Sequence, residues 1–460
     1  MGMVLIFFFS LISSISPSYA FDPLDPYGNI TIKWDLLLSN SGTNNLLYYF
    51  KGLCLENSLC KSVFDICFLP CKVMVSIYNF QQYRHVEPPG WKLNWAWRGK
   101  EVIWSMQGAE ATEQGNCSEF KGPTLPHCCE KKPFIVDLLP GTNYNSQTQN
   151  CCKAGVLSSI KQDPSKYAAT FQMAVGGSGT YSRFVMPEDL KLGVPGYSCG
   201  GAVKVKPSRY TTDGGRRWTQ ALATWNVTCM YSQILASPTP RCCVSLSAFY
   251  NQTIVSCPRC SCGCQGQPGT ECVKYGETPP LQKQNHDPAT PVVRCSEHMC
   301  PIRVHWHLKE SYKQYWRVKI TITNFNIMKN YSEWNLVVLH PNLQSLTQVF
   351  SFNYAPLNRY GFIIDYYADD SGMFWGLPFY NDILLQEGKN GNLQTEILLR
   401  KDPGIFTFRE GWAFPRKIQF NGDECVMPPP DEYPSLPNKG HSATTPFIIL
   451  FSLFLSIFML

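Results

Sequence analysis

The chain has 460 residues, a formal net charge of +6, 21 cysteines, 34 prolines and 13% aromatic residues. Its Lys and Arg residues are scattered and form no basic block, which argues against nucleic acid as a partner. The length is room for about two domains, and the many aromatic residues and prolines favour a β-rich protein with long loops.

The N-terminus carries the pattern of a secretory signal peptide. An apolar run lies between Val4 and Ile12, and small residues lead to Ser18 and Ala20. We therefore predict a signal peptide over residues 1–20, although the usual basic start is missing. N-glycosylation sequons support the secretory route, and they occur at Asn29, Asn116, Asn226, Asn251 and Asn330. In that compartment most cysteines form disulfides, and the odd count leaves at least one thiol unpaired or intermolecular.

Residues 29–35 alternate apolar and polar side chains and predict a first strand, with Ile30, Ile32 and Trp34 on one face. Residues 37–71 then break the pattern. They mix a polar piece with an apolar piece, have no clear period, and carry four cysteines. We treat them as an atypical insertion.

The best functional candidates lie in the strand predicted after the Pro88-Pro89-Gly90 turn. Trp91, Trp95 and Trp97 fall on one face of it, because same-face residues alternate along a strand. Indole rings in a row form an apolar ridge on which the C–H faces of sugar rings stack, and Tyr83 lies nearby in sequence. The competing interpretation is a buried sandwich face, since inward aromatics are the rule in such folds.

Nine cysteines lie between Cys242 and Cys300, and residues 241–300 are predicted to be a disulfide-rich connector. The alternation returns beyond it, most strongly in residues 302–309 and 316–323. A short repeat links the two halves: an alternating strand ends in Asn79-Phe80 and again in Asn324-Phe325. A Trp-Xaa-Leu start of a strand follows each time, at Trp91 and Trp334. The repeat predicts two β-sandwich domains of similar plan.

No strong catalytic or metal motif is present. His305 and His307 share a strand face but lack a third ligand, so we predict no metal and no cofactor. Acidic residues at Asp369, Asp370, Asp382 and Glu387 are the only basis for a glycosidase, and nothing in the sequence fixes their separation.

The C-terminus ends in an apolar run, residues 447–460, which is shorter than the roughly twenty residues that span a bilayer. A polar spacer precedes it. Small residue, spacer and hydrophobic tail form the signal for a glycosylphosphatidylinositol (GPI) anchor, so residues 436–460 are the predicted signal and Asn438 the predicted attachment site. Ser442-Ala443-Thr444 is an alternative site with almost no spacer, and a poor membrane-anchoring helix is the competing interpretation.

Several motifs together resemble the plant COBRA family: Asn-Ile-Thr-Ile-Lys-Trp-Asp (29–35), Asn-Phe-Gln-Gln-Tyr-Arg-His (79–85), Cys-Cys-Val-Ser (242–245) and Asn-Gly-Asp-Glu-Cys-Val-Met-Pro-Pro-Pro (421–430). The resemblance implies a GPI-anchored extracellular protein involved in cellulose deposition, with an N-terminal part likened to a cellulose-binding module. It maps the family's Tyr-Arg-His motif onto Tyr83, Arg84 and His85, and its Trp motifs onto Trp91, Trp95 and Trp97. Family members join the first two strands by a short segment, so we interpret residues 37–71 as an unspliced intron or a faulty gene model.

The sequence thus predicts an all-β protein of two β-sandwiches, residues 21–240 and 301–435, joined by the connector. The predicted protein holds cellulose or another β-glucan at the outer face of the plasma membrane, through Tyr83 and the three tryptophans, and is not an enzyme. It is expected to promote microfibril deposition and oriented cell expansion. A glucan-remodelling glycosidase or transglycosylase is the alternative.

Overall fold

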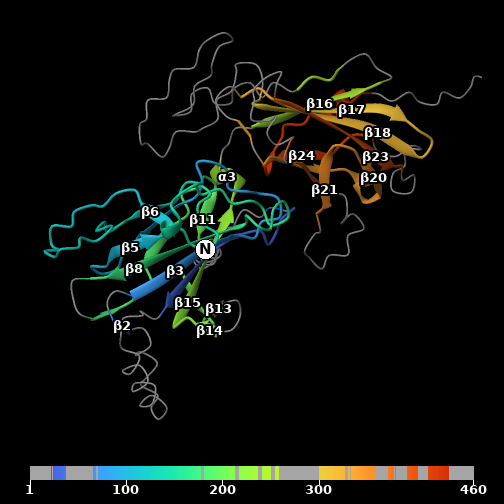
Figure 1. The fold of residues 1–460 in the computed structure, drawn as a ribbon. Coiled ribbons are helices and arrows are strands. Elements are labelled where there is room, and N and C mark those ends of the chain that lie inside the picture. The colour runs from blue at the N-terminus through green and yellow to red at the C-terminus, as the bar shows by residue number, and fades with distance from the viewer. Residues whose placement is uncertain are drawn as a thin grey trace, which may run out of the picture. The chain divides into compact units, whose positions relative to one another are not determined.

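The computed structural model describes residues 22, 24–37, 66–68, 71–177, 181–212, 217–236, 241–249, 254–257, 300–326, 330–331, 333–357, 371–377, 379, 391–401 and 413–434. The predicted signal peptide, the predicted anchor signal with Asn438, and Asn251 lie outside these residues. The chain forms two units, one reaching to Pro238 and one holding most of the chain from Thr239 on (Figure 1). Strands dominate both units, which confirms the all-β prediction. No helix in the described ranges has the length and apolar character to cross a membrane.

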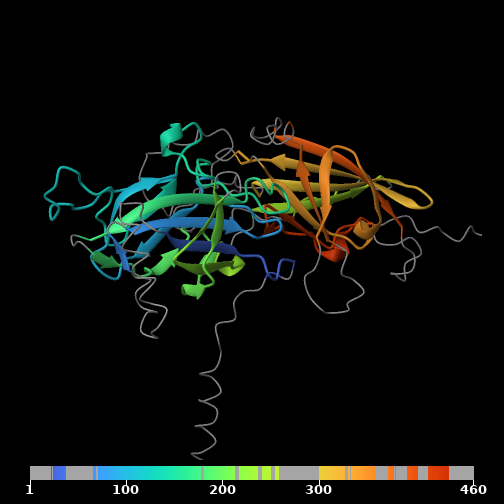
Figure 2. The ribbon, with the colours of Figure 1, turned by 60° about the horizontal axis from the view of Figure 1, so that its bottom comes forward.

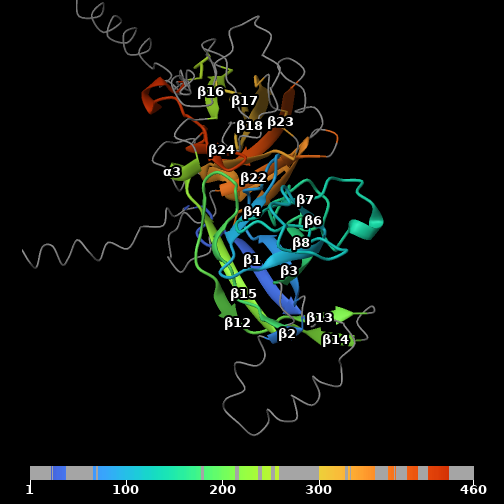
Figure 3. The same cartoon turned by 90° about the vertical axis from the view of Figure 1, so that its left-hand side faces the viewer.

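Unit 1 is built from a seven-stranded and a four-stranded antiparallel sheet (Figure 3). The larger sheet runs in the order β11-β15-β1-β3-β8-β5, with β12 also paired to β15. Its strands are β1 (Ile30–Leu37), β3 (Cys71–Asn79), β5 (Val102–Gln107), β8 (Ala168–Gly176), β11 (Tyr197–Cys199), β12 (Val203–Val205) and β15 (Ala223–Tyr231). The smaller sheet, β10-β4-β7-β6, consists of β4 (Lys92–Ala96), β6 (Ala109–Ala111), β7 (Phe134–Asp137) and β10 (Glu188–Lys191).

Alternation along these strands separates a core face from an outer face. In β1 the residues Ile30, Ile32 and Trp34 are buried, as predicted, and they pack in one cluster with the inward residues of β3, β4 and β8. Gly90 begins the approach to β4 with a positive φ of 86°, and a Cβ there would clash with the carbonyl group of Ala154. Glycine at this turn therefore places Trp91 at the start of the inward row.

The atypical insertion connects two strands that pair with each other in unit 1. β1 and β3 are antiparallel neighbours, and Leu37 pairs directly with Lys72. Leu37 and Cys71, which we had placed in the insertion, belong to these strands. The only described part of the segment in between, β2 (Ile66–Phe68), pairs with β9 (Tyr181–Arg183) in a separate small sheet. The pairing of β1 with β3 in the main sheet thus does not involve β2.

Unit 2 is built from two five-stranded sheets, drawn mostly in gold to red in Figure 2. The first, β16-β17-β18-β23-β20, contains β16 (Cys242–Ala248), β17 (Ile302–Ser311), β18 (Tyr315–Asn324), β20 (Leu346–Val349) and β23 (Asn392–Arg400). The second, β21-β22-β19-β24-β25, contains β19 (Asn335–Leu339), β21 (Phe352–Pro356), β22 (Ser371–Gly376), β24 (Lys417–Phe420) and β25 (Asp423–Glu424). Their facing side chains form the second core.

The predicted connector does not begin at residue 241. Residues 242–248 are instead the strand β16, which pairs in parallel with β17. The reason is visible in the sequence: Val244 and Leu246 alternate with Ser245 and Ser247, and the apolar residues are fully buried. Residues 258–299 of the predicted connector lie outside the described ranges.

Disulfides are present, as the secretory interpretation requires. Among described residues they join Cys117 to Cys129, Cys151 to Cys152, Cys199 to Cys229, Cys242 to Cys425 and Cys243 to Cys257. Cys128 is a buried free thiol, and burial raises its pKa. Such a thiol is poorly reactive, because the thiolate is the nucleophile.

The internal repeat corresponds to a shared structural device. Asn79 and Asn324 end β3 and β18, and both are fully buried. Each side-chain oxygen accepts a hydrogen bond from the backbone N–H two residues further on, that of Gln81 at 3.2 Å and that of Asn326 at 2.8 Å. An Asx turn therefore reverses the chain after the strand in both units.

Buried His340 makes the stability of unit 2 dependent on pH. Its Nδ1 accepts the backbone N–H of Asn342, and burial lowers its pKa from 6.5 to about 3. Below pH 6.5 His340 is protonated in the unfolded chain but stays neutral in the folded chain, so the free energy of unfolding decreases as the pH falls. We expect the free energy of unfolding to drop by about 2 kcal/mol from this residue between pH 7 and pH 5, measured by urea titration.

The matched variant is His340→Gln, which keeps a hydrogen-bond acceptor and cannot titrate. We expect it to be less stable than the natural chain at pH 7 but to lose less stability on acidification. Equal slopes of stability against pH in the two proteins would contradict the assignment.

Candidate functional site

The three predicted tryptophans belong to the core of unit 1. Trp91, Trp95 and Trp97 are 1%, 0% and 1% exposed. The ring of Trp91 stacks on Phe171 with centroids 5.9 Å apart, and Trp95 meets Trp34 edge-on at 5.0 Å. The prediction of an exposed indole ridge is therefore wrong: the row faces the seven-stranded sheet, where large apolar side chains release the most water.

Tyr83 is also buried, and its hydroxyl group serves the fold. It donates a 2.5 Å hydrogen bond to Oδ2 of Asp22, and Nη2 of Arg84 lies 3.6 Å from the same oxygen. The guanidinium group of Arg84 stacks 3.4 Å above the ring centroid of Tyr231. Burial, followed by the charge of Asp22, raises the pKa of Tyr83 well above its usual value. Its ring is not available to a sugar, which corrects the second part of the site prediction.

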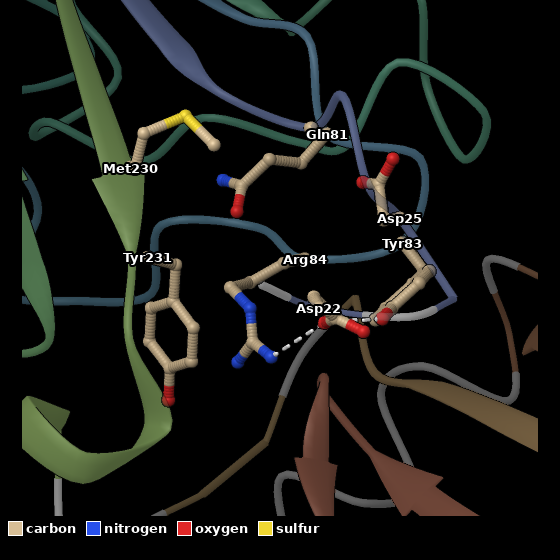
Figure 4. Close-up of a pocket in the computed structure, with 8 residues that line it drawn as sticks. Asp22, Asp25, Gln81, Tyr83, Arg84, Met230 and Tyr231 are labelled. Atoms are coloured by element: carbon tan, nitrogen blue, oxygen red, sulfur yellow. Dashed lines mark hydrogen bonds and ion pairs between the residues drawn. The ribbon is translucent and has the colours of Figure 1, made fainter. Parts of the chain in front are cut away.

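These groups line a small pocket (Figure 4), together with Asp25, Gly28, Gln81 and Met230. Asp25 accepts hydrogen bonds from both the backbone and the side chain of Gln82, at 2.8 and 3.3 Å. Desolvation nevertheless raises the pKa of Asp25. The carboxylates of the pocket thus hold residues 22–25 against the turn at 81–84, and the pocket is best explained as a structural junction.

The same turn places a different aromatic side chain on the outer face of the sheet. The side-chain amide of Asn79 donates to the carbonyl groups of Arg84 and Ser158, so the chain folds back beneath the sheet after this residue. Phe80, on the opposite face, is 41% exposed, and its N–H donates to the carbonyl of Asn29. The Asn-Phe-Gln-Gln-Tyr-Arg-His motif therefore turns Tyr83 inward and Phe80 outward.

Phe80 forms a continuous aromatic surface with Tyr78 and Tyr167, which we call the aromatic platform. The rings of Tyr78 and Phe80 are stacked, with centroids 5.7 Å apart and planes 16° apart. Tyr167 lies 6.0 Å from Tyr78 and 6.1 Å from Phe80. Tyr78 and Tyr167 are half-buried. The three rings lie where β3 ends and β8 begins, on the outer face of the seven-stranded sheet.

Polar groups surround this platform. Nζ of Lys33 lies 5.5 Å from the ring centroid of Tyr78 and 5.7 Å from that of Tyr210. Lys33 also contacts Asp35 at 3.5 Å, and Thr31 pairs directly with Tyr78. Apolar ring faces with charged and hydroxyl groups at their edges are the combination that a sugar ring needs, because its C–H faces are apolar and its hydroxyl groups point outward from its edge.

One predicted glycosylation site borders the platform. Asn226 lies directly opposite Lys33, on the outer face and away from the inward Val227. Asn116 and Asn330 are exposed, and Asn29 is half-buried at the start of β1. Attachment of glycans at these residues remains a prediction.

No group of three or more His, Cys, Asp or Glu residues within the described ranges is placed to hold a metal ion. The acidic residues on which a glycosidase mechanism would depend, Asp369, Asp370, Asp382 and Glu387, lie outside those ranges. The two carboxylates of the pocket in unit 1, Asp22 and Asp25, are engaged in the turn contacts.

Comparison with known proteins gives matches over nearly the whole chain. The family model of the COBRA N-terminal domain matches residues 71–232, and that of the COBRA family C-terminal domain matches residues 241–434. COBRA-like protein 6 of Arabidopsis thaliana is 57% identical over 428 residues, covering 92% of this chain and 87% of that protein. COBRA-like protein 1 of Oryza sativa subsp. japonica is 52% identical over 462 residues, or 98% and 95% of the two chains. Protein COBRA of Arabidopsis thaliana is 51% identical over 448 residues, or 95% and 91%.

Proposed function

The chain belongs to the COBRA family, membership of which implies a function related to the plant cell wall, and we propose that within this function it binds β-glucan chains such as cellulose. The observation that carries the proposal is the aromatic platform of Tyr78, Phe80 and Tyr167 on the outer face of unit 1. The rings lie along the outer face of a sheet and not in a deep pocket, which suits a linear polysaccharide better than a compact ligand.

In this proposal the protein acts without catalysis. Glucose units stack on the rings, Lys33 donates hydrogen bonds to sugar hydroxyl groups, and the hydroxyl group of Thr31 donates or accepts them. Several weak contacts along one chain add up to useful affinity, whereas each one alone exchanges rapidly. Such binding retains nascent glucan chains long enough to influence how they align and crystallise, and thereby the direction of cell expansion.

The proposed location is the outer face of the plasma membrane, with a GPI lipid on Asn438. The disulfides support an oxidising compartment, because such bonds are rare in the cytosol. Tethering also serves the proposed function, since a membrane-anchored binder meets the glucan where it leaves the cell. Release of the protein by a phosphatidylinositol-specific phospholipase, lost in an Asn438→Gln variant, would support this anchor.

Glucan binding is tested with Phe80→Ala in the full-length chain. We expect its dissociation constant for cellohexaose to rise about fivefold, because one ring contact of this kind contributes about 1 kcal/mol. Isothermal titration calorimetry measures this change, and sedimentation with amorphous and crystalline cellulose extends it to the polymer. Because Phe80 is partly exposed, the variant should retain its thermal unfolding midpoint within a few degrees.

Phe134→Ala is the matched control, since Phe134 is 49% exposed in β7 of the other sheet of unit 1. We expect it to bind like the natural chain. Equal binding by the Phe80 and Phe134 variants would refute the platform as the site. New product lengths after incubation of the natural chain with cello-oligosaccharides would favour the glycosidase or transglycosylase alternative.

A further inference from the structure

Unit 2 carries a second polar surface that the proposed glucan site does not use. It lies on the outer face of the sheet β16-β17-β18-β23-β20. We call five of the basic residues there the basic face: Arg303, His307, Lys309, Arg317 and Lys319. All five are half-exposed. His307 lies directly opposite Lys319, and the bulge in β17 brings Lys309 and Arg317 toward the same strand, β23.

Positive charge exceeds negative charge on this face. Glu396 of β23 is held by two cations, at 2.7 Å from Nζ of Lys309 and 2.6 Å from Nη2 of Arg317. Glu310 contributes one further contact, at 3.9 Å from Arg317. The basic face, as defined by its five residues, thus has four permanent cations beside two carboxylates. Lys309 and Arg317 form ion pairs with these carboxylates, whereas the charges of Arg303 and Lys319 are not neutralised by them.

Those two cations have no carboxylate partner in the described part of the chain. Arg303 stacks on the ring of Phe325 at 5.0 Å, and its Nε is enclosed without a hydrogen-bond partner. Beside it in the same cross-strand row, Oγ1 of Thr323 and Oδ1 of Asn392 are also unpartnered. Lys319 lies between His307 and Glu396 in the next row but one, where Glu396 already pairs with other cations.

Two histidines on this face lie beside the same cations. His305 and His307 stack with centroids 6.2 Å apart, and both bond to the hydroxyl group of Ser247. Burial, followed by the nearby charges of His307, Arg303 and Lys319, lowers the pKa of His305 to about 4. Burial, followed by the charges of Lys319 and Lys309, also lowers the pKa of His307. No carboxylate of the described residues lowers this effect at either histidine, so this region disfavours added positive charge and favours an anion.

We propose that the basic face binds an acidic polysaccharide, a linear chain of uronic acid units. Charge complementarity supports an anionic partner, and the succession of these residues in rows along neighbouring strands supports a linear one. The exposed or half-exposed Thr321 and Gln394 share a row and offer hydrogen-bonding groups to sugar hydroxyls. The site is separate from the aromatic platform, so this protein would contact a neutral and an acidic wall polymer through different units.

The test uses the full-length chain and polygalacturonic acid. We expect Lys319→Gln to weaken binding at least threefold at low salt, measured by biolayer interferometry, and Arg303→Gln to do the same. The control is Lys313→Gln, which removes the same charge from the exposed hairpin between β17 and β18 and should leave binding within twofold. Binding should also weaken with rising salt, because exposed charges are screened.

A fully methyl-esterified galacturonan has the same backbone without the charges and should not bind. Equal binding to this polymer would overturn the proposal, as would equal losses in the Lys319 and Lys313 variants. Vesicles containing phosphatidylserine address anionic lipid as the other source of negative charge. Stronger binding to these vesicles than to polygalacturonic acid, lost in Lys319→Gln, would assign the face to the membrane and overturn the polysaccharide as its partner.

Discussion

Replacing Trp95 by alanine is expected to lower the free energy of unfolding of unit 1 by about 3–5 kcal/mol. Trp95 is fully buried and meets two other indole rings edge-on, that of Trp34 at 5.0 Å and that of Trp97 at 5.5 Å. Alanine would leave a cavity between the two sheets and remove both ring contacts. The measurement is a urea titration of the purified chain, with secretion yield as a second readout.

Trp95→Phe is the matched variant, because it keeps an aromatic ring and removes only part of the indole. Nε1 of Trp95 has no hydrogen-bond partner in the described ranges, so the loss of this donor leaves no acceptor unsatisfied. We expect the phenylalanine variant to be markedly more stable than the alanine variant. A Trp95→Ala protein as stable as the natural one would mean that the indole is exposed, and would restore the predicted sugar-binding ridge.

The burial of these indoles decides how glucan binding must be tested. A chain without Trp91, Trp95 and Trp97 would lose binding because unit 1 unfolds, even if no tryptophan touches a sugar. Phe80→Ala separates the two effects, because its ring is partly exposed and belongs to the platform. Only a variant that keeps its unfolding midpoint can assign a binding role to a side chain.

The strands of the core were predictable because their periodicity is local. Ile30, Ile32 and Trp34 alternate with Thr31 and Lys33, and both sheets of unit 1 use this alternation. Alternation also told us that the three tryptophans share one face. It did not tell us that this face meets a second layer, since the strands opposite β4 are distant in sequence and their approach depends on tertiary packing.

The platform was missed for a related reason. Tyr78 and Phe80 occupy the parity opposite to the inward Val75 and Ile77, and this is the signal that could have identified them. The binding site was predicted at the larger indole rings of the next strand instead. Tyr167 carries no local signal at all, because it joins the other two rings only through the pairing of β3 with β8.

The Cys-Cys-Val-Ser motif shows how composition can hide periodicity. Nine cysteines in one stretch favoured a connector, whereas residues 242–248 alternate in the same way as any sheet strand. Cys242 points into the core of unit 2, and Cys243, on the other face, pairs with Cys257. The adjacent cysteines therefore form two different disulfides, which neither the number of cysteines nor their spacing could predict.

Removal of the disulfide Cys242–Cys425 is the second change expected to have a large effect on stability. This disulfide joins the first strand of unit 2 to the residue after β25, across a sequence separation of 183. In the chain-entropy account, closing so long a loop stabilises the folded state by about 5 kcal/mol. Alanine at both positions should therefore lower the free energy of unfolding of unit 2 by several kcal/mol, and hydrogen exchange should show earlier opening of β16 and β17.

The control is removal of Cys117–Cys129, a disulfide of unit 1 that spans a sequence separation of only 12. The same account gives about 3 kcal/mol for a loop of this size, so its loss should cost unit 1 clearly less than the loss of Cys242–Cys425 costs unit 2. Alanine is preferred to serine in both cases, because Cys242 and Cys425 are buried and a hydroxyl group there would need a new partner. If the short-loop variant is the less stable of the two, loop closure does not explain how these bonds stabilise the protein, and direct packing of the sulfur atoms in the core becomes the better explanation.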